Sequence, residues 1–298
     1  MNPLDQASTR LDVPKTLEIV TAALGPATAI REIKHDDRLA AAVARWDHRG
    51  AFVDLREANA IRVILNLTSG QQLEWRCNDR STRGSVSAGS VSVVQPNSFS
   101  EVAIGGRAGT VQVILARDFL SASKAGGTQL DTEAERLRRL QALATQALVA
   151  LSRGANGHDD LCAIAVTAAQ IIAVRNVQSL PYNGGLAPAA LKRVKECLDS
   201  RLGQEPYTTP ALSELAAAAG LSRFHFIRAF RRSTGQTPQA WVTGRRINYA
   251  LRALLEDAAR VDKLADLTGF SSPSHFVSTF RQCVGVTPAK VREAVGFA

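Results

Sequence analysis

Apolar and polar positions follow two different periods along this chain of 298 residues. Between residues 50 and 117, short segments rich in Val and Ile alternate apolar with polar residues and are broken by Gly, Asn and Ser. A period of two residues, interrupted by turn residues every ~8–12 positions, is typical of strands in a sandwich or small barrel. We therefore predict a β-rich unit over residues 50–117. The preceding residues 4–44 are predicted to be mainly helical or irregular.

From residue 132 the period becomes that of an α-helix. Residues 134–151 and 159–174 predict two amphipathic helices, which pack either on the barrel or against a second copy of the chain. Pro and Gly then interrupt the pattern over residues 178–188, which predicts a linker. The predicted fold is an α+β multidomain chain. A β-barrel domain with two following helices covers residues 1–177, and an all-α domain covers residues 189–298.

A pattern of helix, glycine turn and helix occurs twice in the second domain. LAAAAGLSRFHFIRAFRRSTGQTP runs from Leu215 to Pro238, and LADLTGFSSPSHFVSTFRQCVGVTP runs from Leu264 to Pro288. A repeat of about 50 residues indicates one supersecondary unit used twice. This unit has the outline of a helix-turn-helix, whose second helix enters a DNA groove. The predicted helices span residues 210–219, 223–233, 238–256, 261–268 and 273–284.

The two second helices of the repeat have different outward faces. In the first, Phe226 and Phe230 belong to the core, whereas the outward face holds Arg223, Phe224, Ile227, Arg228 and Arg231. Arg228 is the best candidate for a bidentate contact with guanine, and Phe224 or Ile227 for a contact with a thymine methyl group. The alternative is that Phe224 and Ile227 are core residues and that the arginines only face solvent. The second helix presents the less basic set Ser274, His275, Ser278 and Arg281, which favours shape-dependent readout.

The net charge of +9 is concentrated on the repeat-bearing segment. Residues 187–298 carry 16 Lys and Arg against 9 Asp and Glu, whereas residues 1–186 carry 20 against 18. A basic segment points to a polyanionic partner. Arg245, near the start of the predicted helix 238–256, is a candidate for phosphate contact.

Residues 186–294 resemble the DNA-binding domain of AraC/XylS-family transcription regulators. The doubled motif and the connecting RRINYALRALLE segment carry this resemblance. It implies a seven-helix domain that binds double-stranded promoter DNA. The family's base contacts fall on Phe224, Ile227 and Arg228, and on Pro273, Ser274, His275 and Ser278, where Ser278 replaces a frequent arginine. It also implies a homodimeric activator that contacts RNA polymerase, and residues 1–177 more loosely resemble the family's cupin-like sensing and dimerisation domain.

One stretch of the β-rich unit is a candidate ligand site. R-x-x-x-R (Arg76 and Arg80) overlaps D-x-S-x-x-G (Asp79, Ser81 and Gly84), with Arg83 between them. Arginines four residues apart can bind phosphate or a guanine edge, and a nearby Asp can accept from guanine N–H groups. The two patterns are similar to those with which PilZ domains bind cyclic di-GMP, although there they are separated by other strands. The alternatives are a solvated basic hairpin, and a sugar, aromatic or amino-acid derivative bound inside the barrel.

Other functional classes find less support in the sequence. The predicted strands contain no histidine, which argues against a metal-dependent cupin enzyme, and no nucleotide-binding or nucleophile motif is present. The four cysteines are scattered, and no secretory signal or apolar run of about 18 residues occurs. We therefore expect a cytoplasmic, ligand-controlled DNA-binding regulator that is not an enzyme and has no metal or cofactor.

Overall fold

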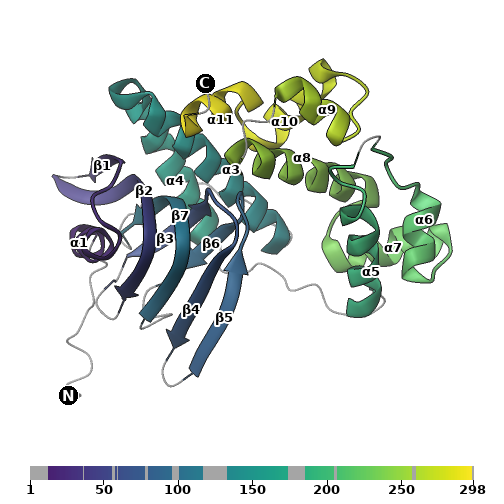
Figure 1. Ribbon diagram of the computed structural model, residues 1–298, viewed down its shortest axis with the longest axis horizontal. Helices are drawn as coiled ribbons and strands as arrows, with labels where there is room; N and C mark the ends of the chain where they lie inside the picture. The colour runs from purple at the N-terminus through teal and green to yellow at the C-terminus, as the bar shows by residue number, and fades with distance from the viewer. Residues whose placement is uncertain are drawn as a thin grey trace.

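The computed structural model describes residues 13–35, 37–55, 58, 60–77, 80–95, 101–116, 133–173, 185–204, 207–256 and 260–296. A strand-rich N-terminal part is followed by a helical C-terminal part (Figure 1). The N-terminal part begins with helix α1 and holds seven strands: α1 (Val13–Leu24), β1 (Ala29–His35), β2 (Arg38–Asp54), β3 (Ile61–Asn66), β4 (Gln71–Cys77), β5 (Arg80–Val86), β6 (Val91–Val94) and β7 (Glu101–Leu115). None of the helices in the described ranges is long and apolar enough to cross a membrane.

The seven strands form one antiparallel sheet organised around β7. One edge of β7 pairs with β2, while its other edge pairs with β4 near its start and with β3 near its end. Within the described residues β1, β5 and β6 each pair with one neighbour only. The predicted cupin-like barrel is therefore not confirmed by the strand pairing.

The sheet begins earlier in the chain than the sequence predicts. Strands β1 and β2 occupy residues 29–54, much of which was expected to be helical or irregular. The Ala-rich start of β2, residues 40–44, is buried and pairs with the end of β7. Alanine favours helices, but tertiary burial overrides this preference here. Although glycines interrupt the apolar pattern near residue 105, β7 is a single strand that continues through Gly105 and Gly106.

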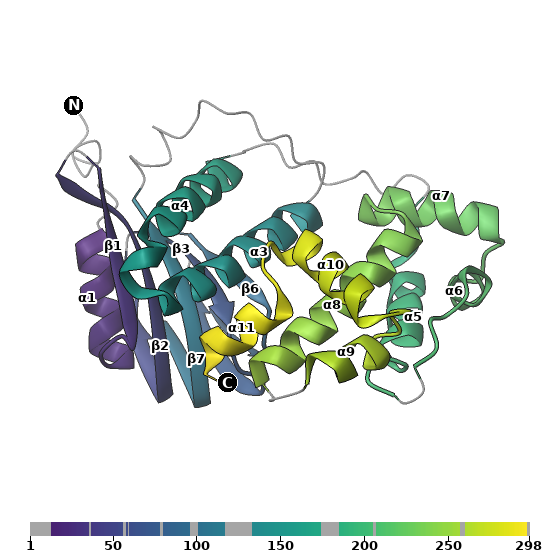
Figure 2. The same cartoon turned by 90° about the horizontal axis from the view of Figure 1, so that it is seen from above.

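Helices cover both faces of the sheet. Helix α1 contacts β2, while α3 (Glu133–Ser152) contacts five of the strands and α4 (His158–Ala173) packs beside it. Figure 2 shows α3 and α4 over one face. Strand alternation separates the two faces, because Val63 is directed to the side opposite its neighbours Arg62 and Ile64.

The C-terminal part contains seven helices among the described residues, the number that the family resemblance implies. They are α5 (Pro188–Asp199), α6 (Leu212–Ala219), α7 (Arg223–Thr234), α8 (Pro238–Glu256), α9 (Val261–Leu267), α10 (Pro273–Val284) and α11 (Pro288–Val295). Helix α6 is followed by α7, and α9 by α10, across short turns. That these pairs act as two helix-turn-helix units stays a prediction. Helix α6 starts at Leu212 and not at the predicted residue 210. The N–H of Ala211, the residue before it, donates to the Glu214 carboxylate at 2.6 Å.

The helical part is divided between two hydrophobic cores. Helices α5, α6 and α7 share a core of their own, to which α8 adds Val242. Helices α8 to α11 instead share one continuous core with the sheet, α3 and α4. Gln146 of α3 donates to the Val284 carbonyl of α10 at 3.1 Å, and Arg45 of β2 donates to the Ala294 carbonyl of α11 at 3.0 Å. The pair α9–α10 is thus docked on the N-terminal part, while α6–α7 lies farther out (Figure 1). The proposed division into residues 1–177, 178–188 and 189–298 stays a prediction.

Candidate functional site

Helix α7 presents an apolar pair of side chains to solvent. Phe224 is 83% exposed and Ile227 is 37% exposed, whereas Phe226 and Phe230 are fully buried. The alternative that Phe224 and Ile227 belong to the core is therefore excluded. The other residues of the predicted outward face are also exposed: Arg223, Arg228 and Arg231.

The position of this face is fixed by the turns and rings around it. Gly220 adopts a left-handed φ of 74° between α6 and α7, where a side chain would be disfavoured. The Phe226 and Phe230 rings are 5.3 Å apart, and Phe230 meets Trp241 of α8 edge to face at 5.4 Å. These contacts anchor one side of α7 and leave its opposite side free.

The arginines of this face have no counter-charge within the part of the chain that the structure describes. Arg223, Arg228 and Arg231 form no ion pair with any residue that the structure describes. Other arginines in the same part of the chain do, since Arg201 binds the Glu214 carboxylate with an N–O distance of 2.6 Å. The outward face of α7 therefore combines uncompensated positive charge with exposed apolar surface.

Helix α10 presents the smaller polar face that the sequence predicts. All four residues of this face are exposed: Ser274, His275, Ser278 and Arg281. Ser274, Ser278 and Arg281 also border a shallow hollow on the surface of the helix. The His275 N–H donates to the Ser272 hydroxyl at 3.2 Å, which caps the helix. Its ring lies 5.3 Å from the Phe270 ring.

Arg245 lies on α8, as the sequence predicts, but its guanidinium is already bound to a carboxylate. Its guanidinium pairs with the Asp199 carboxylate of α5 and lies 5.9 Å from the Trp241 ring centre. Half-buried and already paired, it joins α8 to α5, and a phosphate would have to replace this ion pair. Its contact with phosphate stays a prediction. Its neighbour Arg246 likewise donates to the Thr268 carbonyl and stacks over Phe270.

The predicted nucleotide motif lies on the hairpin of β4 and β5 instead of in one loop. Arg76 pairs with Glu101 at 3.0 Å, and Glu74 accepts from Ser81 at 2.7 Å and from Arg83 at 3.0 Å. The Ser81 and Arg83 hydrogen bonds hold the pKa of Glu74 below its usual range. Two of the three arginines are thus bound to carboxylates. Asp79 and the side chain of Arg80 lie outside the described residues.

Gly84 has a structural explanation on the opposite face of this hairpin. A Cβ atom at Gly84 would lie 2.8 Å from a ring carbon of Trp75, so the glycine makes room for the indole. Its place in the D-x-S-x-x-G pattern therefore does not require a ligand.

A cavity of about 270 Å³ lies between α1 and the inner face of the sheet. Its walls are mostly apolar, and the polar residues that line it include His48 of β2, Arg62 of β3 and Gln112 of β7. Burial lowers the pKa of His48, and the charge of Asp47 offsets this only in part. The sequence analysis missed this group, and its expectation of strands without histidine is wrong, because His35 and His48 lie in β1 and β2. No cluster of three potential metal ligands occurs among the described residues.

Comparison with known families identifies part of the chain. Residues 215–294 match a family described as "Helix-turn-helix domain". This segment begins in α6 and ends in α11, so it includes both helix–turn–helix pairs. The match supports the resemblance to AraC-type DNA-binding domains over this segment.

Curated relatives match the same end of the chain. The virulence regulon transcriptional activator VirF of Yersinia enterocolitica is 36% identical over 81 residues, which are 27% of this chain and 30% of VirF. The regulator ExsA of Pseudomonas aeruginosa is 34% identical over 82 residues, 28% of this chain and 30% of ExsA. The chain thus spans about a third of the length of these relatives.

Two solved structures are also similar to the chain. The DNA-binding domain of AdpA, solved in complex with a target DNA, is 32% identical; the match covers 36% of this chain and 93% of that domain, with a TM-score of 0.32. Wild-type ToxT of Vibrio cholerae, solved with a bound unsaturated fatty acid, is 12% identical. The match covers 89% of this chain and 99% of ToxT, with a TM-score of 0.35.

Proposed function

We propose that the chain is a transcriptional regulator that binds specific double-stranded promoter DNA through α7. The outward face of α7 carries this proposal. Phe224 and Ile227 are exposed beside arginines without counter-charge, which a merely solvated surface does not require. Arg228 is suited to bidentate contact with guanine O6 and N7, and Phe224 to contact with a thymine methyl group.

Helix α10 supplies the second contact in this proposal. Helix α8, which joins the two helix–turn–helix pairs, has 19 residues and so spans roughly 28 Å at about 1.5 Å per residue. Successive major-groove faces on one side of DNA recur every ~34 Å. The serines and His275 of α10 read shape and backbone more than base edges.

Arg228→Ala tests the proposed contact. The full chain selects its preferred site from random DNA, and binding to that site is measured by fluorescence anisotropy. We expect Arg228→Ala to weaken specific binding by ~1–3 kcal/mol and to relax one base position. Arg252→Ala removes the same charge from the exposed face of α8 and serves as the control, with an unchanged base preference. Equal effects of both substitutions would show that Arg228 contributes charge alone.

Control by a small effector is the second part of the proposal. Cyclic di-GMP at the β4–β5 hairpin remains one candidate, supported by the motif of Arg76, Arg80 and Ser81. The pairing of Arg76 with Glu101 and of Arg83 with Glu74 weakens its support, because binding would have to replace these ion pairs. Calorimetric titration of cyclic di-GMP into the wild type and Arg80→Ala decides it. No heat with the wild type ends the hairpin assignment.

The remaining features of the regulator are proposals of the same kind. Homodimerisation through the N-terminal part, contact with RNA polymerase as an activator, a cytoplasmic location and the lack of enzymatic activity all derive from the family resemblance. The second effector candidate is a small metabolite in the cavity under α1, which the polar side chains there favour.

A further inference from the structure

The cavity under α1 contains a charged side chain that has no partner among the described residues. Arg62 is only 5% exposed, yet its guanidinium makes no hydrogen bond or ion pair with any described residue. Its pKa is lowered to about 10 by burial, with no carboxylate to oppose the effect. Arg62 therefore stays protonated at neutral pH and faces the cavity as a bare cation.

Such an arrangement is costly for a folded protein. Buried arginines are almost always paired, because taking an ion out of water costs several kcal/mol unless a counter-charge is present. Other polar atoms in the same cavity are also buried without a hydrogen-bond partner among the described residues, including Oε1 of Gln112. Gln112 of β7 pairs in register with Ile64 of β3, and Arg62 lies two residues before Ile64 on the same strand. The side chains of Arg62 and Gln112 are therefore diagonal neighbours on one face of the sheet. The unmet demand for hydrogen bonds is thus concentrated at one place.

The shape of the cavity limits what can meet this demand. Val20 and Leu24 of α1 and Leu73 and Trp75 of β4 line it with apolar surface. Its volume of about 270 Å³ lies just below the ~300–1,000 Å³ of common ligand pockets. A compact molecule with an apolar body fits this space, whereas a cyclic dinucleotide with two bases, two sugars and two phosphates is too large.

We propose that the cavity binds a compact monocarboxylic acid, with its carboxylate on Arg62 and its apolar body against α1 and Trp75. The planar guanidinium suits a bidentate carboxylate, and the bound anion supplies the missing counter-charge. This inference names the chemical class of the effector and rests on the proposed function only for its regulatory meaning. Binding itself is measured without DNA.

The test compares acids with neutral amides of the same shape on the full chain. Phenylacetate and hexanoate, with phenylacetamide and hexanamide, are titrated at millimolar concentrations while thermal unfolding and binding heat are followed. We expect the acids, but not the amides, to raise Tm. Arg62→Met is expected to weaken acid binding by about 10- to 100-fold, as loss of charge-assisted hydrogen bonds requires. Arg49→Met, at an exposed arginine of β2, is the control and is expected to bind the acids like the wild type.

Two further readouts keep the inference refutable. Without ligand, Arg62→Met is expected to unfold at the same temperature as the wild type or higher, because a lone buried charge has been replaced by an apolar chain. Arg62→Lys is expected to retain weaker binding of acids and none of amides. The inference would be overturned if acids and amides raised the Tm of the wild type equally, or if neither acid raised it. If Arg62→Met does not fold, this comparison of acids with amides on the wild type decides alone. A chain that binds acids but prefers no DNA sequence would refute the proposed function and leave the cavity assignment intact.

Discussion

Two phenylalanines on helix α7, two residues apart, are predicted to have opposite roles. Phe226 is fully buried against Phe230, with the rings 5.3 Å apart, so Phe226→Ala leaves a cavity in the small core of α5 to α7. Such a truncation costs about 3–5 kcal/mol of the free energy of unfolding. Phe224 is 83% exposed, and Phe224→Ala should change the same quantity by less than about 0.5 kcal/mol.

Phe224 should contribute to DNA affinity although it contributes little to the free energy of unfolding. If the groove covers roughly 100 Å² of the Phe224 ring, burial at about 25 cal/mol per Å² contributes about 2.5 kcal/mol. This corresponds to a loss of affinity of roughly 60-fold in Phe224→Ala. The substitution is therefore expected to leave a stable protein that binds its site poorly.

Urea unfolding and fluorescence anisotropy on the selected DNA site measure the two effects separately. Phe52→Ala is the matched control, because Phe52 is 59% exposed but lies on β2, far from α7 in the chain, and should alter neither quantity. Wild-type affinity in Phe224→Ala would refute the argument for a recognition face. So would a loss of stability comparable to that of Phe226→Ala.

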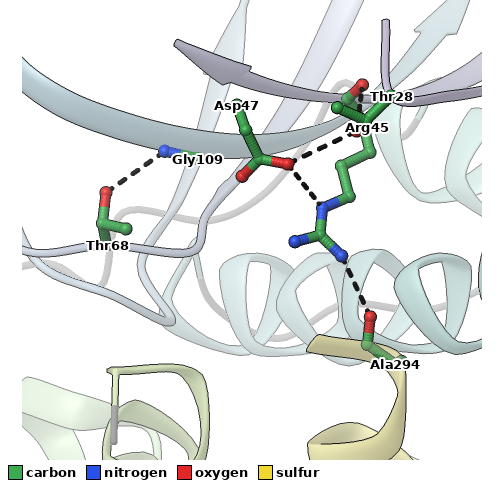
Figure 3. Close-up of polar contacts among 6 residues, drawn as sticks. All are labelled: Thr28, Arg45, Asp47, Thr68, Gly109 and Ala294. Atoms are coloured by element: carbon green, nitrogen blue, oxygen red, sulfur yellow. Dashed lines mark hydrogen bonds and ion pairs between the residues drawn. The ribbon is translucent and has the colours of Figure 1, made fainter. Parts of the chain in front are cut away.

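Two further predictions concern the local contacts that hold the C-terminal helices. Hydrogen bonds from Arg201 and from the Ala211 N–H lower the pKa of Glu214, so the stability that ionised Glu214 contributes is present above the usual Glu range and is lost as the pH falls through its folded pKa. Urea unfolding at varied pH should therefore show a smaller loss of stability at acid pH in Glu214→Gln than in the wild type. An equal loss in both proteins would contradict this prediction. Arg45 donates to the Ala294 carbonyl at the C-terminal end of α11, as Figure 3 shows, where a cation also meets the negative end of the helix dipole. Arg45→Met should therefore speed amide exchange in α11 and leave α7 unchanged, whereas equal exchange in α11 would show that packing alone docks it.

The C-terminal helices could be predicted closely because local signals agree there with the tertiary structure. Helix α8 starts at Pro238 and ends at Glu256, as the Thr-Pro start and the apolar period indicate. Helix α10 likewise starts at Pro273 after its Ser272 cap. The exposed face of α7 followed from the same period, because Phe226 and Phe230 fix which side is buried.

The N-terminal part was less predictable because its structure depends on contacts distant in sequence. The alanines of β2 favour a helix locally and become a strand only through pairing with β7. Arg62 lies in an apolar run, IRVILN, that predicts a strand but does not reveal a buried cation. The pairing of Arg245 with Asp199, 46 residues away, likewise has no local signal.

Methylation interference on the selected site tests the central claim most directly. The full chain binds DNA that carries sparse methyl groups on guanine N7, and bound and free fractions are compared base by base. Contact of α7 with the major groove predicts that methylation within one block of the site prevents binding, and that Arg228→Ala loses sensitivity at one guanine of that block. Binding that is indifferent to N7 methylation throughout the site would contradict major-groove recognition by α7.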